Sequence, residues 1–135
     1  MDSLISFEGA ADVINNLVDK LSGAVGWIAT HNSPKREALS TYIAEVQKMD
    51  IDPLEKAALI SNAKRSIKEY TNQQNVVKNA LCRMDSNSRP EAVEDDWIAQ
   101  LMDKVRLVSD ANFQAIWGAI LASECNEPGS IPKAL

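Results

Sequence analysis

The stretch from Pro53 to Met84 contains no glycine and no second proline, and it constrains the fold more than any other part of the sequence. Its seam positions, most of them apolar, recur at alternating steps of three and four residues, which is the spacing of a heptad seam along one side of a helix. The seam consists of Ile60, Ala63, Ile67, Tyr70, Gln74, Val77, Leu81 and Met84. The pattern predicts one long central helix, about 48 Å in length at 1.5 Å per residue if it is unbroken.

This seam has two interpretations. In the favoured one it packs against other helices of the same chain, and in the alternative it forms a dimer. Residues 71–75 are polar and poor helix formers, so a break or bend is expected there, while a polar seam residue such as Gln74 can fix the register of a pairing. The candidate interaction residues are Ile60, Ile67, Tyr70, Gln74, Val77 and Leu81, together with Trp27 near the start of the chain.

Apolar residues at helical spacing also predict helices on either side of this segment. Residues 10–30 form a first amphipathic helix, and Ser33-Pro34 begins a second one. Asp52 stands where its carboxylate can cap the long helix. Aromatic residues make up only 5% of the chain, which favours packed helices over a β-sandwich. We therefore predict an all-α fold of about five helices.

Residues 85–90, with the sequence DSNSRP, indicate a linker that divides the chain into two predicted parts. The first is a helical unit with the long helix, over residues 1–84. The second is a tryptophan-containing helical hairpin, over residues 91–130, packed on the first. A length of 135 residues suits one domain, so both parts are expected to share it.

The second helix of the hairpin follows a predicted cap at Asp110. Its residues expected to face the core are Phe113, Ile116, Trp117, Ile120 and Leu121. Beyond it, Ser130 has the place of a cap for a further helix. A helix that begins so near Leu135 suggests the front part of a longer protein, and whether Leu135 is the natural end stays open.

The charge of the chain restricts its partners. A net charge of −5 and a pI near 4.8 argue against general nucleic-acid binding, which requires a surplus of lysine and arginine. Residues 34–84 do carry more bases than acids, which we attribute to complementarity within the chain, with a local RNA or anionic-lipid patch as the alternative. The start of the chain lacks the basic region of a signal peptide, so a cytoplasmic location is expected.

No pattern in the sequence points to catalysis. His31 is the single histidine, and neither Cys82 nor Cys125 lies in a CxxC or Cys/His spacing, so no metal-ligand set or nucleophile motif is formed. Both thiols are expected to be buried and reduced. The acidic residues at 91 and 94–96 are explained by the positive end of a helix dipole. We expect no cofactor, no metal and no enzymatic activity.

Residues 10–30 leave one further alternative, a membrane-perturbing effector that acts through this amphipathic helix. Small residues surround Trp27 there, but the polar side of the helix carries Asp12, Asp19 and Lys20 as its single cation. Interfacial helices prefer lysine and arginine against anionic lipid. Membrane contact is therefore not favoured, and packing in the core is.

The hairpin resembles a known family. Asp95-Asp96-Trp97, Ser109-Asp110, residues 117–126 and Pro128-Gly129-Ser130 are similar to the D-W…SD…W…ILA-x-E…PGS pattern of the bacterial domain of unknown function 2806 family (DUF2806). The resemblance is specific over residues 94–130 and looser over 10–84.

This resemblance carries no activity and no site residues. The family is distantly similar to abortive-infection alpha proteins, which implies a context of phage defence or phage counter-defence. Together with the absence of catalytic motifs, we expect a non-catalytic helical module for protein–protein interaction or oligomerisation, whose partner is another protein or a second copy.

Overall fold

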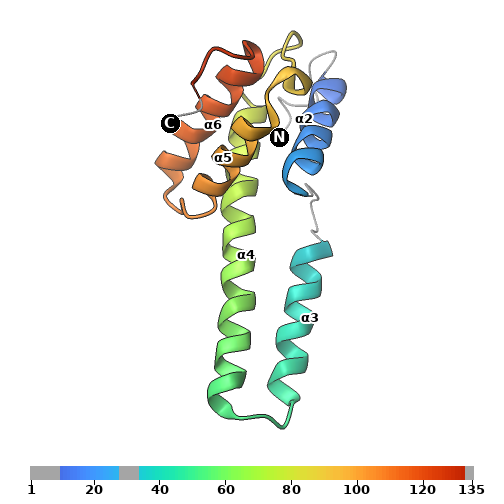
Figure 1. The fold of residues 1–135 in the computed structure, drawn as a ribbon, viewed down its shortest axis with the longest axis vertical. Helices are drawn as coiled ribbons and strands as arrows, with labels where there is room; N and C mark the ends of the chain where they lie inside the picture. The colour runs from blue at the N-terminus through green and yellow to red at the C-terminus, as the bar shows by residue number, and fades with distance from the viewer. Residues whose placement is uncertain (1–9, 28–33, 133–135) are drawn as a thin grey trace.

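The computed structural model describes residues 10–27 and 34–132. Within these ranges all regular structure is helical and no strand occurs. The elements in chain order are α2 (Ala10–Val25), α3 (Pro34–Lys48), α4 (Pro53–Leu81), the short 3-10 helix η1 (Pro90–Ala92), α5 (Asp95–Val105) and α6 (Ala111–Asn126) (Figure 1). The predicted all-α fold of about five helices, with a long central helix and C-terminal helices, is confirmed.

Helix α4 begins as the sequence predicts. The Asp52 carboxylate accepts hydrogen bonds from the backbone N–H groups of Leu54 at 3.0 Å and Glu55 at 3.2 Å. The helix spans 29 residues, about 44 Å at 1.5 Å per residue. It ends at Leu81, three residues before the predicted end, where Cys82 is the cap residue.

The expected break at residues 71–75 is not present, because α4 continues through them. Polar side chains in this run donate to backbone carbonyl groups outside the helix. The Asn72 amide donates to Arg106 O at 2.8 Å, and the Gln73 amide donates to Met102 O at 3.0 Å. These bonds join α4 to α5 and the turn after it, so polarity here reflects tertiary contacts.

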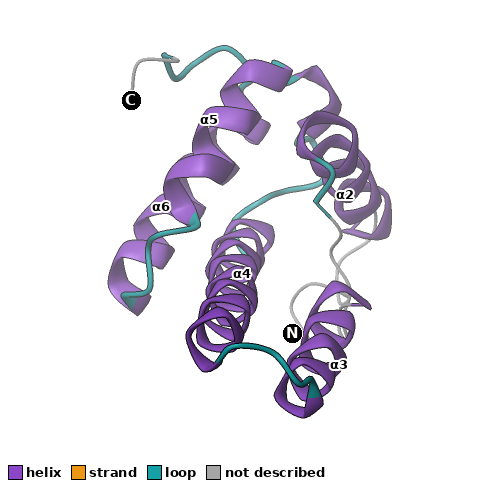
Figure 2. Ribbon diagram, turned by 60° about the horizontal axis from the view of Figure 1, so that its bottom comes forward, coloured by secondary structure: helices purple, strands orange, loops and turns teal. Residues whose placement is uncertain are grey.

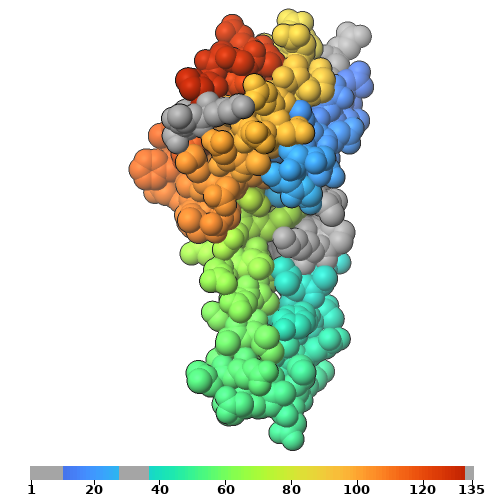
Figure 3. Space-filling view, in the orientation of Figure 1, coloured from blue at the N-terminus to red at the C-terminus, as the bar shows by residue number. Residues whose placement is uncertain are grey.

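The molecule has a broad end and a narrow end. α3 lies alongside the N-terminal half of α4, and the two form a slender projecting hairpin (Figures 1 and 3). At the other end α2, α5 and α6 gather around the C-terminal half of α4. Seen from the narrow end, α2 and α6 lie on different sides of α4 (Figure 2). α4 is thus the one element that runs through both ends.

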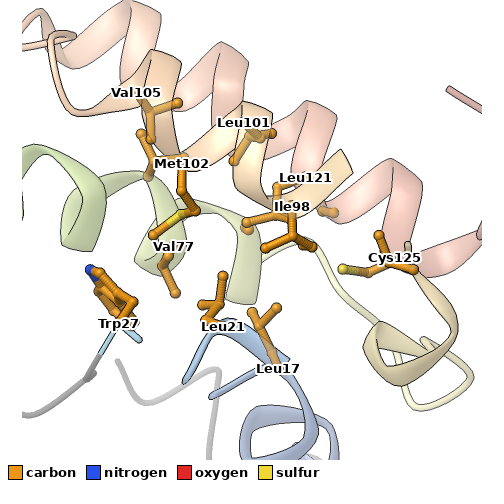
Figure 4. Close-up of a cluster of buried hydrophobic side chains, with 14 of the residues drawn as sticks. Leu17, Leu21, Trp27, Val77, Ile98, Leu101, Met102, Val105, Leu121 and Cys125 are labelled. Carbon is orange, nitrogen blue, oxygen red and sulfur yellow. The ribbon is translucent and has the colours of Figure 1, made fainter. Parts of the chain in front are cut away.

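The hydrophobic core fills the broad end of the molecule. α2, α4, α5 and α6 all contribute fully buried side chains, which Figure 4 shows converging between the helices. They include Leu17, Leu21, Val76, Val77, Ala80, Ile98, Leu101, Met102, Leu121 and Cys125. Residues from both predicted parts, 1–84 and 91–130, therefore belong to one cluster.

Helix α2 is shorter than the predicted helix over residues 10–30. It ends at Val25 because Gly26 has a φ of +70°, a left-handed conformation that glycine adopts without steric cost. The chain then turns back, and Trp27 is buried in the core. Residues 28–33, with His31 and the predicted cap Ser33, lie outside the described residues.

The further helix expected from Ser130 would extend into residues 133–135, which lie outside the described residues, so it stays a prediction. The Glu124 carboxylate binds the segment between α6 and Pro132. It accepts hydrogen bonds from the backbone N–H groups of Gly129 at 2.7 Å and Ile131 at 2.9 Å. The segment is therefore held against the end of α6 in a non-helical conformation.

Candidate interaction surface

The predicted interaction residues on α4 lie in two environments. Tyr70 and Val77 are buried in the core, and the ring of Trp27 stacks on Tyr70 with centroids 5.6 Å apart and planes 20° from parallel. Figure 4 shows Trp27 and Val77 pointing into the same cluster. The remaining four, Ile60, Ile67, Gln74 and Leu81, are half-buried.

The seam residues are thus wholly or partly buried by other parts of the same chain. Ala63 is also buried on the half of α4 that lies beside α3, and Leu81 packs against the core cluster. A partner that used Tyr70 or Val77 would have to displace α2 or Trp27. The role of these seven residues in contacting a partner stays a prediction, and a partner surface is better sought elsewhere on the molecule.

The two cysteines, which the sequence offered as candidate nucleophiles, differ in burial. Cys125 is buried, and its burial, followed by the nearby Glu124 and Glu91 carboxylates, raises the pKa of its thiol to about 12. Cys82 is exposed, so the expectation of two buried thiols is wrong for this residue, which follows the last turn of α4 at the surface. Within residues 10–27 and 34–132, no three His, Cys, Asp or Glu side chains come together to hold a metal ion.

The motif residues of the hairpin make structural contacts. Glu124 is buried although it is acidic, and its carboxylate satisfies two backbone N–H groups of the turn that follows α6. Asp95, in the first turn of α5, forms an ion pair with Lys20 of α2 at 2.7 Å. These contacts fix α6 and α5 to their surroundings. Motif residues also line a cavity of about 180 Å³ between them, whose lining consists of Glu94, Trp97, Glu124, Gly129, Ile131 and Pro132.

One side of α6 packs against α4. Its buried residues there are Gln114, Gly118, Leu121, Ala122 and Cys125. At Gly118 the two helices are so close that a Cβ atom would lie 3.0 Å from both the Val76 carbonyl oxygen and the Ala80 nitrogen. The lack of a side chain at this position permits that approach.

The opposite side of α6 is apolar as well, and two of its large side chains are exposed, while Ile120 is half-buried against the core. Phe113 exposes 59% of its surface and Ile116 exposes 53%. A shallow groove of about 330 Å³ runs beside Ile116. Its lining consists of Arg83, Ala115, Ile116, Ala119, Ile120, Ser123 and Ile131. We call Phe113 and this lining the outer face of α6.

The outer face corrects a sequence prediction. Of the five residues expected to face the core, Leu121 is buried, and Trp117 and Ile120 pack partly against it. Phe113 and Ile116 were expected there too, but at 100° per residue they lie on the side away from it. Periodicity cannot assign the buried side of a helix that is apolar all round. The informative signal is the small residue Gly118, which marks the side of closest approach.

A helix that is apolar on both sides is typical of an element covered on both sides. In α6 the inner side is covered by α4, and the outer face is not covered by any described residue that hides Phe113 or Ile116. Exposed apolar patches of this kind mark sites of contact with other proteins or membranes.

The sequence model of the family described as "Protein of unknown function (DUF2806)" matches residues 60–134, which is more than half of the chain. The matched range includes all of α6 and its outer face. No curated protein and no solved structure matches the chain. The resemblance noted over residues 94–130 is confirmed.

Proposed function

Because the chain belongs to the DUF2806 family, whose description assigns no activity, we propose its function from its surface: it is a non-catalytic helical module that binds another protein chain through the outer face of α6. The observation that carries this proposal is the exposure of Phe113 and Ile116 on a helix that is already packed on its other side. Covering exposed aromatic and aliphatic side chains with a partner removes apolar surface from water, which lowers the free energy of the complex.

The chemistry of the outer face defines the partner. The side chains there are aliphatic, aromatic or small, and Arg83 is the one charged residue among the described residues that line the groove. Such a surface fits the apolar side of a helix, which can lie along a groove beside another helix. We propose a helical protein segment as the partner and the cytoplasm as the place of action.

The test is photocrosslinking in the native host, with benzoylphenylalanine in place of Phe113. We expect irradiation to produce a covalent adduct between this residue and a protein of definite mass. The matched control places the same amino acid at Leu54, which exposes 79% of its surface at the narrow end of the molecule. Adducts at position 54 with none at position 113 would contradict the proposal.

We further propose a biological context, phage defence or counter-defence, which is supported by the similarity of the family to abortive-infection alpha proteins. If the outer face serves this role, Ile116→Asp should abolish the effect of the chain on phage plating, while Leu54→Asp should leave it unchanged. If both variants retain the effect on plating, the defence role does not depend on this surface.

The alternative of a membrane-perturbing effector gains no support from the position of α2. Its apolar residues Val13, Leu17 and Leu21 are buried in the core, so lipid contact would require α2 to leave it. None of the helices described combines the length and the apolar character needed to cross a membrane. Flotation with anionic and neutral liposomes tests the alternative, and we expect the protein to stay at the bottom of the gradient.

A further inference from the structure

We propose that a cleft between the middle of α4 and the turn that joins α5 to α6 binds the phosphate group of a small ligand. The cleft has a volume of about 200 Å³. Figure 1 shows the turn beside α4. The polar and charged side chains that line the cleft are Arg65, Lys68, Glu69, Asn72, Arg106 and Ser109. None of them belongs to the outer face of α6, so this binding site goes beyond the function proposed above.

The cleft is positively charged although the chain is acidic. Three basic side chains, Arg65, Lys68 and Arg106, line it beside one acid, Glu69, so the described lining carries a formal charge of +2. The chain as a whole carries a net charge of −5. A concave site of one sign concentrates ligands of the opposite sign, even where the net charge of the molecule repels them. The charge of the cleft therefore favours an anionic ligand.

Acidic side chains from other parts of the chain do not neutralise these bases. Residues 34–84 hold more bases than acids, and complementarity within the chain was expected to balance them. Among the described side chains, however, the basic residues of this stretch form a single ion pair, between Arg65 and Glu69 of the same helix. No described residue forms an ion pair or a hydrogen bond with the ammonium group of Lys68. That ammonium group is therefore available to a ligand.

Both arginines are held in place by carboxylates. Arg106 donates through Nε to Asp103 at 2.9 Å and through Nη1 to Glu69 at 3.3 Å. These bonds use two of the five N–H groups of the guanidinium, and the other three can donate to a ligand. Arg65 Nε lies 3.9 Å from the Glu69 carboxylate. Glu69 is thus a positioning residue that contacts arginines from two different elements.

A buried amide joins the two walls of the cleft. Asn72 on α4 is buried, and its side chain donates to Arg106 O at 2.8 Å and to Ser109 Oγ at 3.5 Å. Because the Ser109 oxygen accepts this bond, its own hydrogen can donate to a ligand. Hydroxyl, ammonium and guanidinium groups are therefore present together, and all three are donors that bind phosphate oxygens.

The size and the donors of the cleft favour phosphate over other anions. Donors come from both walls, which suits the several oxygens of a tetrahedral phosphate better than the two oxygens of a carboxylate. An RNA strand needs a basic surface along its backbone, which the overall charge of the chain does not provide. Leu107 also lines the cleft and exposes 67% of its surface, so it offers an apolar contact to a group attached to the phosphate.

Isothermal titration calorimetry of the purified full chain tests the site. The probes are inorganic phosphate and AMP, and the blank is chloride at the same ionic strength. We expect saturable binding with a dissociation constant of about 1 mM or lower. Tighter binding of AMP would identify an ester as the ligand, and equal binding would identify the free ion, so both results support a phosphate site. The absence of saturable binding with either probe overturns the inference.

Lys68→Glu tests whether the phosphate binds in this cleft. The substitution reverses a charge that has no described partner, so the fold should be retained, and we expect a dissociation constant at least about tenfold higher. Lys78→Glu makes the same change on another exposed residue of α4, outside the lining, and its dissociation constant should stay close to that of the wild type. Equal weakening by both substitutions would indicate attraction by net charge alone and would overturn the site. Circular dichroism verifies that each variant is folded.

The position of the ligand is tested by the backbone amide NMR signals during the phosphate titration. We expect the signals of Lys68, Leu107 and Ser109 to shift, because these residues line the cleft, while the signal of Leu54 stays unchanged. Shifts that are spread evenly over the chain, or that occur only outside the cleft, would contradict the assignment.

A short single-stranded RNA distinguishes a nucleic-acid surface from a phosphate site. If the RNA binds and inorganic phosphate does not displace it, the basic residues serve an extended strand and the inference is wrong. Displacement by phosphate, or no binding of RNA, agrees with a site for a single phosphate group. None of these measurements involves Phe113 or Ile116, so a failure of this inference is distinguishable from a failure of the function proposed for the outer face.

Discussion

Gly118 shows how a single residue determines the packing of α6. Its missing side chain allows close contact with Val76 and Ala80 of α4, and this contact in turn fixes which side of α6 faces outward. The sequence alone indicated five core-facing residues in α6. Leu121 is buried and Trp117 and Ile120 pack partly against the core, but Phe113 and Ile116 are exposed. The difference arises because the small residues, and not the largest ones, define the inner side.

Gly118→Ala is expected to destabilise the protein by about 1–3 kcal/mol, because the added methyl group must push α4 and α6 apart. This loss exceeds the gain of up to about 1 kcal/mol that alanine brings within a helix. Gly23→Ala is the matched control: this helical glycine of α2 has no atom within 4 Å of an added Cβ, so the variant should be stabilised. Urea unfolding measures both, and equal effects of the two substitutions would refute the packing argument.

The two cysteines should differ in reactivity. Cys82 is exposed, whereas Cys125 is buried with a thiol pKa raised to about 12, so it lacks both access and thiolate character at neutral pH. A maleimide reagent should label the native protein once, at Cys82, and twice after denaturation. Mass spectrometry of digested protein identifies the site, and rapid labelling of Cys125 in the native state would contradict the burial.

At the scale of elements, the sequence correctly predicts which segments of the chain are helical. The helix starts at Pro53 and after Asp110 follow from capping chemistry, which is local and therefore visible in the sequence. The end of α2 at Val25 is followed by a glycine in the left-handed conformation, and the polar run inside α4 bonds to a distant turn through Asn72. Neither a backbone conformation nor a contact between distant residues can be read from the spacing of apolar residues in the sequence.

Asp52→Ala is expected to lower the free energy of unfolding by about 1 kcal/mol, because two backbone N–H groups at the start of α4 lose their acceptor. Asp52→Asn retains a capping oxygen and should cost much less. Thermal or urea unfolding compares the two variants. Equal losses for alanine and asparagine would indicate that the charge, and not the cap, matters here.

At the scale of the whole molecule, we expect the two ends to differ in stability. The narrow end holds α3, where Val46 is the buried hydrophobic residue among those described, while α5 buries Trp97, Ile98, Leu101, Met102 and Val105. Elements with few buried contacts open at lower free energy. Amide hydrogen exchange should therefore be faster throughout α3 than in α5, and comparable protection of both helices would contradict this division.

In the whole molecule, the two candidate interaction surfaces differ in exposure. The seam on α4 was predicted from the sequence, and Tyr70, Val77 and Met84 of it are buried within the fold. The outer face of α6 was not predicted as a surface, because exposure of Phe113 and Ile116 depends on how α6 rests against α4. The central claim is that the outer face of α6, and not the seam, engages the partner.

The most direct test of this claim is the isoleucine methyl NMR spectrum of the protein, recorded with increasing amounts of the protein that photocrosslinking captures at position 113. Ile116 and Ile120 report on the outer face, and Ile60 and Ile67 report on the seam. We predict that the methyl signals of Ile116 and Ile120 shift as the captured protein is added while those of Ile60 and Ile67 stay unchanged. Shifts confined to Ile60 and Ile67, or the absence of any shift at Ile116, would contradict the account.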